Sequence, residues 1–178
     1  ILGVGRLAPQ KNFKLLIEAY HQSIAPTEGI HLVILGVGSE QLKLMQRANE
    51  LGIEALVHFE GFQENPYSFM KNAVAFILSS QWEGFGHVLV EAMACECPVI
   101  STDCDFGPND ILDRGRYGKL VAVNDMKLMS EEINTVITLE EKKRNEVIQK
   151  AKDRAQDFSM DKIVRTYEHL FSTLSGIK

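Results

Sequence analysis

The segment 73–94, AVAFILSSQWEGFGHVLVEAMA, contains the pattern that decides the fold. It begins with the longest apolar run of the chain, which predicts a strand over residues 74–78. A strand that is apolar at every position is buried on both faces, which is typical of a parallel sheet between two layers of helices. A polar loop follows from about Ser79, and a helix is predicted from about Gly86 to Cys95. The segment is therefore predicted to be one strand–loop–helix unit of a parallel sheet.

Apolar runs alternate with amphipathic stretches along most of the remaining chain. Apolar residues at helical spacing predict a helix from Phe13 to Ile24, and Ser39 is expected to cap another helix that ends at Leu51. Further strands are expected at residues 1–4, 31–35, 57–59, 98–101 and 120–123, and further helices at residues 65–71, 127–137, 138–157 and 159–174. This order and the right-handed crossover rule predict an α/β fold: a Rossmann-like, doubly wound parallel sheet of about six strands with C-terminal helices.

The last third of the chain differs from the rest because its helices are not separated by strands. Thr138 and Glu141 have the spacing of a capping box, which predicts that a helix starts there. In the final helix, one apolar stripe is formed by Ile163, Tyr167, Leu170 and Leu174. We expect this stripe to pack against the same domain, and docking onto a part of the protein outside this sequence is the alternative.

Composition limits the classes of protein to which the chain can belong. Its 178 residues correspond to one domain, and 45% hydrophobic residues suit a globular protein with a real core rather than a disordered chain. The formal net charge of −5 argues against a nucleic-acid partner. The three cysteines are too few and too close together for a disulfide framework, and no apolar run reaches the roughly 20 residues of a membrane span. A reducing, cytoplasmic location is expected. Because the chain begins at Ile1 inside an apolar run, we expect a fragment of a longer protein.

In an open parallel sheet, ligands bind beyond the carboxyl ends of the strands, where three loops of this chain have unusual residues. In GVGRLAPQK, residues 3–11, Arg6 and Lys11 present two cations that a diphosphate would use, although both could be solvated surface groups. The glycines of residues 36–38 indicate a tight turn and lack the third glycine of a dinucleotide motif. In EGFQ, residues 60–63, the aromatic ring could contact a base or pack in the core.

A fourth loop, EGFG at residues 83–86, leads into the helix of the opening segment. The amides of about residues 85–88 have no partner inside that helix, and together with the helix dipole they favour an anion such as phosphate. Glu83 precedes these amides, and Glu91 lies four residues beyond His87 on the same side of the helix. Carboxylates repel phosphate but accept hydrogen bonds from hydroxyl groups beside it, as in a nucleoside diphosphate sugar. The alternatives are a helix-surface carboxylate for Glu91 and a first-turn dipole partner for Glu83.

These residues carry a resemblance to a known family. Glu83 and Glu91, separated by seven residues in an EGFG…EAMA context, resemble the EX7E motif of the retaining glycosyltransferases of family 4. GVGRLAPQK resembles that family's GRL…K element, LVILGVGSE resembles its G-x-G turn, and FEGF, CPVISTD and GPNDIL follow in the expected order over about residues 1–125. The resemblance implies that residues 1–178 are the donor-binding, C-terminal half of a GT-B enzyme. The N-terminal acceptor domain is then absent, and packing of a helix of residues 159–178 toward it is the alternative given above for this helix.

The resemblance also implies roles for individual residues, matched by position. Arg6 and Lys11 would bind and neutralise the diphosphate leaving group, and Glu83 would hold hydroxyl groups of the transferred sugar; these are the three expected catalytic residues. Glu91 would hold the ribose. The other donor-binding positions implied are Gly5, Gly61, Phe62, Gly84, Phe85, Gly86, His87, Val88 and Leu89.

Some positions depart from the family pattern or suggest a metal. His87 stands where an aliphatic residue is common, and Asp110 replaces a glutamate, which leaves the contacts of both open. Residues 103–105, DCD, have the spacing of metal-dependent transferases, but the resemblance implies departure of the diphosphate without a metal. Residues 95–97, CEC, are too closely spaced for a zinc site. No metal or other cofactor is expected.

The implied activity is transfer of a hexosyl group, with retention, from a nucleotide sugar to a saccharide or lipid-linked acceptor. A UDP-sugar is the family default for the donor. A GT-B phosphorylase, a nucleotide-sugar epimerase and a degenerate, non-catalytic donor-binding module remain alternatives. Polysaccharide assembly in the cytoplasm is the expected setting, with peripheral attachment to the inner face of the membrane left open. The isolated chain is expected to bind the donor weakly and to transfer nothing.

Overall fold

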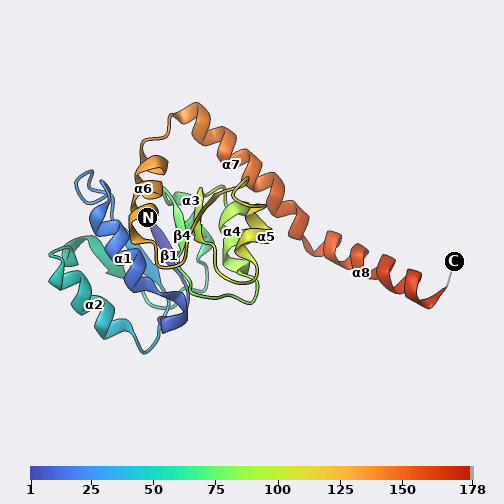
Figure 1. The fold of residues 1–178 in the computed structure, drawn as a ribbon, viewed down its shortest axis with the longest axis horizontal. Coiled ribbons are helices and arrows are strands. Elements are labelled where there is room, and N and C mark those ends of the chain that lie inside the picture. Colours follow the sequence, from blue (N-terminus) through green and yellow to red (C-terminus); the bar gives the residue numbers. More distant parts are fainter. Residues whose placement is uncertain (177–178) are drawn as a thin grey trace.

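The computed structural model describes residues 1–176, in which six parallel strands form one sheet with helices on both faces (Figure 1). The strand order is β3-β2-β1-β4-β5-β6. The strands are β1 (Leu2–Val4), β2 (Leu32–Leu35), β3 (Val57–Phe59), β4 (Phe76–Leu78), β5 (Val99–Thr102) and β6 (Lys119–Val121). The predicted doubly wound α/β fold is thus confirmed, and its strand order reverses between β1 and β4.

The helices follow the strands in alternation until β6, after which three helices end the described chain. They are α1 (Phe13–Gln22), α2 (Gln41–Glu50), α3 (Tyr67–Asn72), α4 (His87–Ala94), α5 (Pro108–Leu112), α6 (Met126–Ile137), α7 (Glu141–Ala155) and α8 (Met160–Ser175). Three short 3-10 turns lie at η1 (Pro9–Lys11), η2 (Glu54–Leu56) and η3 (Gln156–Phe158). The five-residue helix α5 was not predicted, because one and a half turns are too short to show a helical period.

Alternate residues of strands such as β4 supply two hydrophobic cores, one on each face of the sheet. Ile77 packs into the core formed with α1, α2 and α6, whereas its neighbours Phe76 and Leu78 pack into the core formed with α3, α4, α5 and α7. All three side chains are at most 2% exposed. Burying a side chain of this size contributes about 1.5–3 kcal/mol, so a strand buried on both faces stabilises both helical layers.

Two predicted helix caps are wrong. Ser39 does not cap α2, which begins at Gln41 without a side-chain hydrogen bond at its N-terminus. Thr138 ends α6 instead of starting α7, because its hydroxyl donates to the carbonyl of Asn134 at 2.9 Å, one turn back in α6. Helix α7 therefore begins at Glu141.

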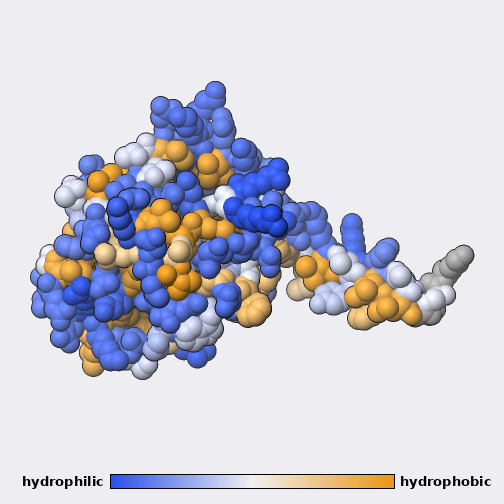
Figure 2. Space-filling model, in the orientation of Figure 1, coloured by the Kyte–Doolittle hydropathy of each residue, from blue (hydrophilic) through white to orange (hydrophobic). Residues whose placement is uncertain are grey.

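The expected packing of α8 against this domain is also wrong. Helix α8 leaves the globular body in a direction away from the sheet (Figure 1), and every side chain from Met160 to Leu174 is exposed. Along the predicted stripe the exposed fraction lies between 40% at Ile163 and 74% at Leu174. Figure 2 shows these apolar residues as orange areas on the protruding helix. A period of 3.6 residues identified the apolar face but not the surface that covers it.

Candidate active site

The candidate site lies at the edge of the sheet where the loops after β1 and β4 meet. These two strands are neighbours although some 70 residues separate them, and their paired residues are Leu2 and Phe76. As a result the Lys11 ammonium lies 2.6 Å from the Glu83 carboxylate oxygen Oε1, across 72 residues of sequence. The reversal of strand order therefore places these two predicted site residues side by side, which is where ligands bind in such sheets.

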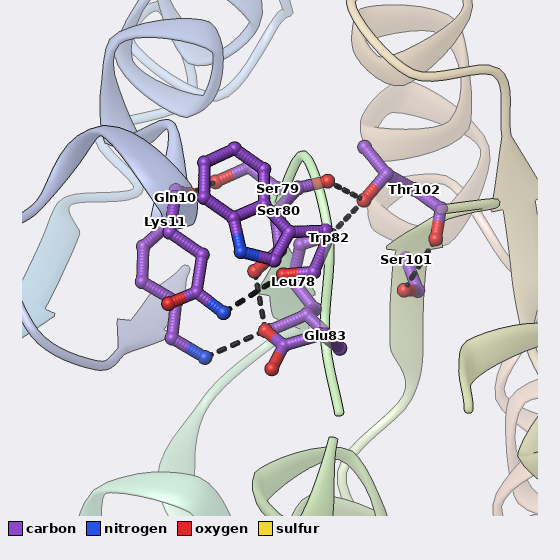
Figure 3. Close-up of polar contacts among 9 residues, drawn as sticks. All are labelled: Gln10, Lys11, Leu78, Ser79, Ser80, Trp82, Glu83, Ser101 and Thr102. Carbon is purple, nitrogen blue, oxygen red and sulfur yellow. Dashed lines mark hydrogen bonds and ion pairs between the residues drawn. The ribbon is translucent and has the colours of Figure 1, made fainter. Parts of the chain in front are cut away.

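Three hydrogen bonds attach the turn that carries Lys11 to the loop after β4, and Figure 3 shows the two that involve Ser79 and the Gln10 side chain. The Ser79 hydroxyl donates to the Lys11 carbonyl at 2.8 Å. The Gln81 amide donates to the Gln10 carbonyl at 2.8 Å, and the Gln10 side chain donates to the Trp82 carbonyl at 2.9 Å. The position of Lys11 relative to this loop is thus set by hydrogen bonds of its own backbone carbonyl and of the neighbouring residue Gln10.

The aliphatic stem of Lys11 lies across Gly5. A Cβ atom at Gly5 would stand 3.1–3.3 Å from three carbons of this stem, which is tighter than ordinary van der Waals contact. Glycine at this position allows Lys11 to lie against the backbone and reach Glu83. Gly5 thereby acts on the site through Lys11.

The Glu83 carboxylate is buried, at 8% exposure, and is held by two donors. The Lys11 ammonium at 2.6 Å and the Ser80 hydroxyl at 2.5 Å both donate to the oxygen Oε1. Figure 3 shows both contacts meeting at this oxygen, with the second oxygen, Oε2, directed away from them. Among residues 1–176, no donor contacts Oε2. A buried carboxylate therefore keeps one oxygen available to accept a hydrogen bond from a ligand.

The N-terminus of α4 lies beside this ion pair. Gly86 has φ +92°, a left-handed conformation that costs least for glycine, and it precedes the first helical residue His87. Within the described chain, no backbone or side-chain acceptor takes the amides of residues 84–88. A cavity of about 480 Å³ is lined by Lys11 and by residues 83–88. The predicted positions Gly84, Phe85, Gly86, His87 and Val88 are thus together with Lys11 and Glu83.

Leu89 differs from the other predicted positions of this loop. Its amide donates to the Gly86 carbonyl at 2.9 Å, and its side chain is fully buried in the core. The expected contact between this amide and a phosphate is therefore wrong, because the first turn of α4 already satisfies it.

Arg6, Gly5 and Phe62 line a neighbouring cavity of about 360 Å³. Its other walls are mostly apolar and come from the ends of β1 and β2 and from the segment between β3 and α3: Val4, Leu35, Gly36, Val37, Gln63 and Pro66. The ring of Phe62 is 74% exposed, so the predicted alternative of core packing is wrong for this residue. Gly61 borders this region through its carbonyl, which accepts the Gly36 amide at 2.6 Å. Arg6 is exposed, and no carboxylate in residues 1–176 pairs with it.

Glu91 does not share the cavity of Glu83. It lies one turn further along α4 and lines a third cavity, of about 540 Å³, between α4, η3 and the start of α8. The two cavities adjoin at Phe85 and His87, which line both, so the expectation that the two glutamates flank one bound ligand stays a prediction. His87 itself is exposed and lies 4.9 Å from Phe85, measured between ring centroids.

The remaining candidates from the sequence have structural partners. The Asp103 carboxylate accepts a hydrogen bond from the Asn109 side chain at 2.8 Å, and Asp105 pairs through its backbone with Trp82. In residues 1–176, no group of three or more metal-ligating side chains is found. Burial raises the pKa of the Cys97 thiol to about 12, which is expected of a thiol packed in a core.

Sequence reasoning missed four residues that shape this site: Gln10, Ser79, Ser80 and Thr102. Ser79 and Ser80 stand between an apolar run and a candidate acidic residue, and this placement was the one available indication. Gln10 and Thr102 had none, because their partners lie on another loop or strand.

The region that the structure describes contains no helix long and apolar enough to cross a membrane.

Comparison with known proteins shows what this arrangement resembles. A family model described as glycosyl transferases group 1 matches residues 1–154. A 4-alpha-N-acetylgalactosaminyltransferase that acts on N-acetylgalactosamine-N,N'-diacetylbacillosaminyl-diphospho-undecaprenol, from Campylobacter jejuni, is 38% identical over 93% of this chain. A lipopolysaccharide 1,6-galactosyltransferase from Salmonella typhimurium is 36% identical over 88% of it. This chain covers 44% of each of these two proteins, so it spans less than half their length.

A solved structure shows the same fold with a nucleotide. The crystal structure of HepE from Anabaena in complex with UDP superposes with a TM-score of 0.85 at 28% identity. The match covers 99% of this chain and 48% of that protein.

Proposed function

This chain belongs to the glycosyl transferases of group 1, and we propose that it is the donor-binding, C-terminal half of a retaining hexosyltransferase. The observation that carries the proposal is the Lys11–Glu83 pair, at 2.6 Å, beside the free amides of the α4 N-terminus. These groups provide a cation and amide donors for a diphosphate, and a carboxylate oxygen for the hydroxyl groups next to it. A nucleoside diphosphate sugar has all of these groups in one molecule.

The diphosphate is the group that must be stabilised. As the bond between the anomeric carbon and the diphosphate breaks, negative charge develops on the phosphate oxygens. Lys11, Arg6 and the amides of residues 84–88 neutralise this charge and need little rearrangement, because the turn of Lys11 is bonded to the loop after β4. The leaving group departs in this scheme without a metal ion.

The nucleoside occupies the apolar cavity next to Arg6. Phe62 and the ends of β1 and β2 provide an apolar surface of a size that suits a base. UDP in the complex of HepE, which has the same fold, supports uridine as the base. Glu91 enters the proposal as the ribose ligand on the family resemblance, from a cavity that adjoins that of Glu83 at Phe85 and His87.

Glu83 orients the sugar and is not the nucleophile. Its oxygen Oε1 is occupied by Lys11 and Ser80, and Oε2 accepts hydroxyl groups of the sugar. We assign retention to attack by the acceptor hydroxyl on the face from which the diphosphate leaves. The new bond joins the acceptor oxygen to the anomeric carbon. The bond between the anomeric carbon and the oxygen of the diphosphate breaks, and the proton of the acceptor hydroxyl passes to the departing phosphate.

The acceptor is bound by a second domain outside this sequence. The relatives are about twice as long as this chain, and the proposal assigns acceptor binding to the part that it does not cover. The uncovered apolar face of α8 docks on that domain, because Tyr167, Leu170 and Leu174 have no surface to pack on in residues 1–176. By analogy with the named relatives, the acceptor is a saccharide or a lipid-linked saccharide, used at the inner face of the membrane.

The experiment that tests the proposal replaces Lys11 or Glu83 by alanine in the full-length enzyme. We expect kcat to fall by about 10²–10³-fold in each variant, as it does when one preorganised electrostatic group is lost. Lys14→Ala is the matched control, because Lys14 lies in the same region with its side chain 66% exposed and its nearest carboxylate 3.9 Å away. Activity is measured with a panel of nucleotide sugars, with and without inorganic phosphate.

Wild-type kcat in Lys11→Ala or Glu83→Ala contradicts these roles. Dependence of the reaction on inorganic phosphate identifies a phosphorylase, conversion of the donor without an acceptor identifies an epimerase, and binding without any turnover identifies a non-catalytic module.

A further inference from the structure

We propose that Ser80 is a positioning residue that orients the Glu83 carboxylate for recognition of the donor sugar. The inference rests on the proposed function, since it concerns how the same site distinguishes a nucleotide sugar from the nucleotide alone. The sequence analysis assigned no role to Ser80. The argument uses three features of the structure: the contacts of the carboxylate, the support of Ser80 itself and the burial of both groups.

The first feature is that two donors converge on one carboxylate oxygen. The carboxylate of a glutamate can rotate about its Cγ–Cδ bond. The Lys11 ammonium, at the end of a flexible stem, can donate to either oxygen. The Ser80 hydroxyl lies in the loop two residues after β4 and donates to the same oxygen, Oε1, at 2.5 Å. With both donors on Oε1, the plane of the carboxylate is set and Oε2 points away from them (Figure 3).

The second feature is that Ser80 is itself held. The Thr102 hydroxyl, on the neighbouring strand β5, donates to the Ser80 carbonyl at 2.6 Å. Ser79, the preceding residue, directs its hydroxyl to the Lys11 carbonyl at 2.8 Å. The two serines therefore hold the two members of the ion pair separately, Ser79 through the backbone of Lys11 and Ser80 through the carboxylate of Glu83.

The third feature is burial. Ser80 and Thr102 are fully buried, and Glu83 is 8% exposed, so water does not replace the serine hydroxyl easily. If Ser80 were lost, Oε1 would keep only Lys11, and the carboxylate would turn between several orientations. The expected consequence is a loss of affinity for the sugar part of the donor, with the nucleotide part unaffected.

The test measures binding of UDP, and of UDP-glucose, UDP-galactose and UDP-N-acetylglucosamine, to the 178-residue chain by calorimetry. The measured quantity is the ratio between the affinity for the tightest of these sugars and the affinity for UDP. Ser80→Ala is expected to lower this ratio about five- to tenfold, which is within the range of one ordinary hydrogen bond, and to change the affinity for UDP less than twofold.

The matched control is Ser101→Ala. Ser101 is also fully buried, at the end of the neighbouring strand, and its hydroxyl donates to the Thr102 carbonyl at 2.9 Å without contacting Glu83. The Ser101→Ala variant measures the effect of removing a buried serine hydroxyl near the site. Its ratio of UDP-sugar affinity to UDP affinity should equal that of the wild type. Ser80→Cys, which keeps a side chain with a weaker donor at this position, provides a second variant if Ser80→Ala is poorly folded, and the same loss of ratio is expected.

A double-mutant cycle decides whether Ser80 acts through Glu83. In a Glu83→Ala background, Ser80→Ala should cause no further change in the ratio. The inference is overturned if Ser80→Ala lowers the affinities for UDP and for the UDP-sugar equally, or if it lowers the ratio in the Glu83→Ala background. It is also overturned if the wild-type chain binds the sugars no more tightly than UDP, although donor binding then stands. A wild-type chain that binds neither UDP nor any of the sugars contradicts the proposed function itself.

Discussion

Helix α7, which ends the globular body of residues 1–158, and helix α8 both have an apolar face, with opposite results. In α7, the last helix of the body, Ala151 and Ala155 are at most 6% exposed in the core beneath α4. In α8, larger apolar side chains such as Leu170 and Phe171 are 47% and 62% exposed. The difference shows that an apolar face is buried only where a complementary surface exists, however strong its helical pattern.

Polar contacts reinforce the difference. The Arg144 guanidinium of α7 donates to the Val74 carbonyl at 2.7 Å, and the Arg154 guanidinium donates to the Ile111 carbonyl at 3.1 Å. These bonds join α7 to the sheet and to α5. The small side chains of α7 allow this close approach, whereas the stripe on α8 needs a partner with a groove of its own.

The largest expected effect on stability tests the core that α7 covers. Leu89 is fully buried in that core, and Leu89→Ala should lower the free energy of unfolding by about 2–5 kcal/mol. Leu170→Ala removes the same atoms from α8 and should change the free energy by no more than about 0.5 kcal/mol. Urea unfolding of the 178-residue chain measures both. Equal costs would mean that α8 packs on the body in solution.

An intermediate effect concerns a buried tyrosine of the body, Tyr20. Burial raises its pKa to about 12, above the ordinary value of 10 that applies when the chain is unfolded. The stabilisation from the neutral phenol is complete below pH 10 and is lost as the pH rises from 10 to 12. The loss amounts to about 2–3 kcal/mol for two pKa units.

The measurement is the free energy of unfolding of the wild type, Tyr20→Phe and Tyr167→Phe between about pH 9 and pH 12. This range covers the pH values over which the stabilisation by Tyr20 is expected to be lost. Tyr20→Phe should remove this part of the alkaline destabilisation. Tyr167, which is 56% exposed on α8, is the control, and its variant should follow the wild type. A Tyr20→Phe curve parallel to the wild-type curve would contradict the assignment.

The smallest expected effect is the removal of residues 166–178 from this chain. These residues contain most of the exposed stripe, and their loss should change the free energy of unfolding of the body by less than about 0.5 kcal/mol. In the full-length protein, the same truncation should lower the thermal unfolding midpoint clearly, because the stripe is proposed to pack on the second domain. Equal behaviour in both contexts would contradict that docking.

The sequence allowed the strands and the main helices to be predicted, since apolar runs and helical periods are local patterns. It failed at Ser39 and Thr138, where several residue types can cap a helix and only the backbone path decides which one does. The same limit applies to the site. Lys11 and Glu83 were predicted as candidates from their residue types and the family resemblance, but the roles of Ser79 and Ser80 depend on contacts across two loops.

By itself, the sequence determined the α/β class, the approximate strand positions and the family, because burial on both faces of a strand requires a continuous apolar run and the motifs are contiguous. Only the tertiary structure decided that one oxygen of Glu83 is held by two donors, that Glu91 lines a separate cavity and that α8 is uncovered. The physical reason is that these properties depend on which strands are neighbours and which surfaces meet. The hydrogen bonds, burial and cavities that follow join residues far apart in the chain.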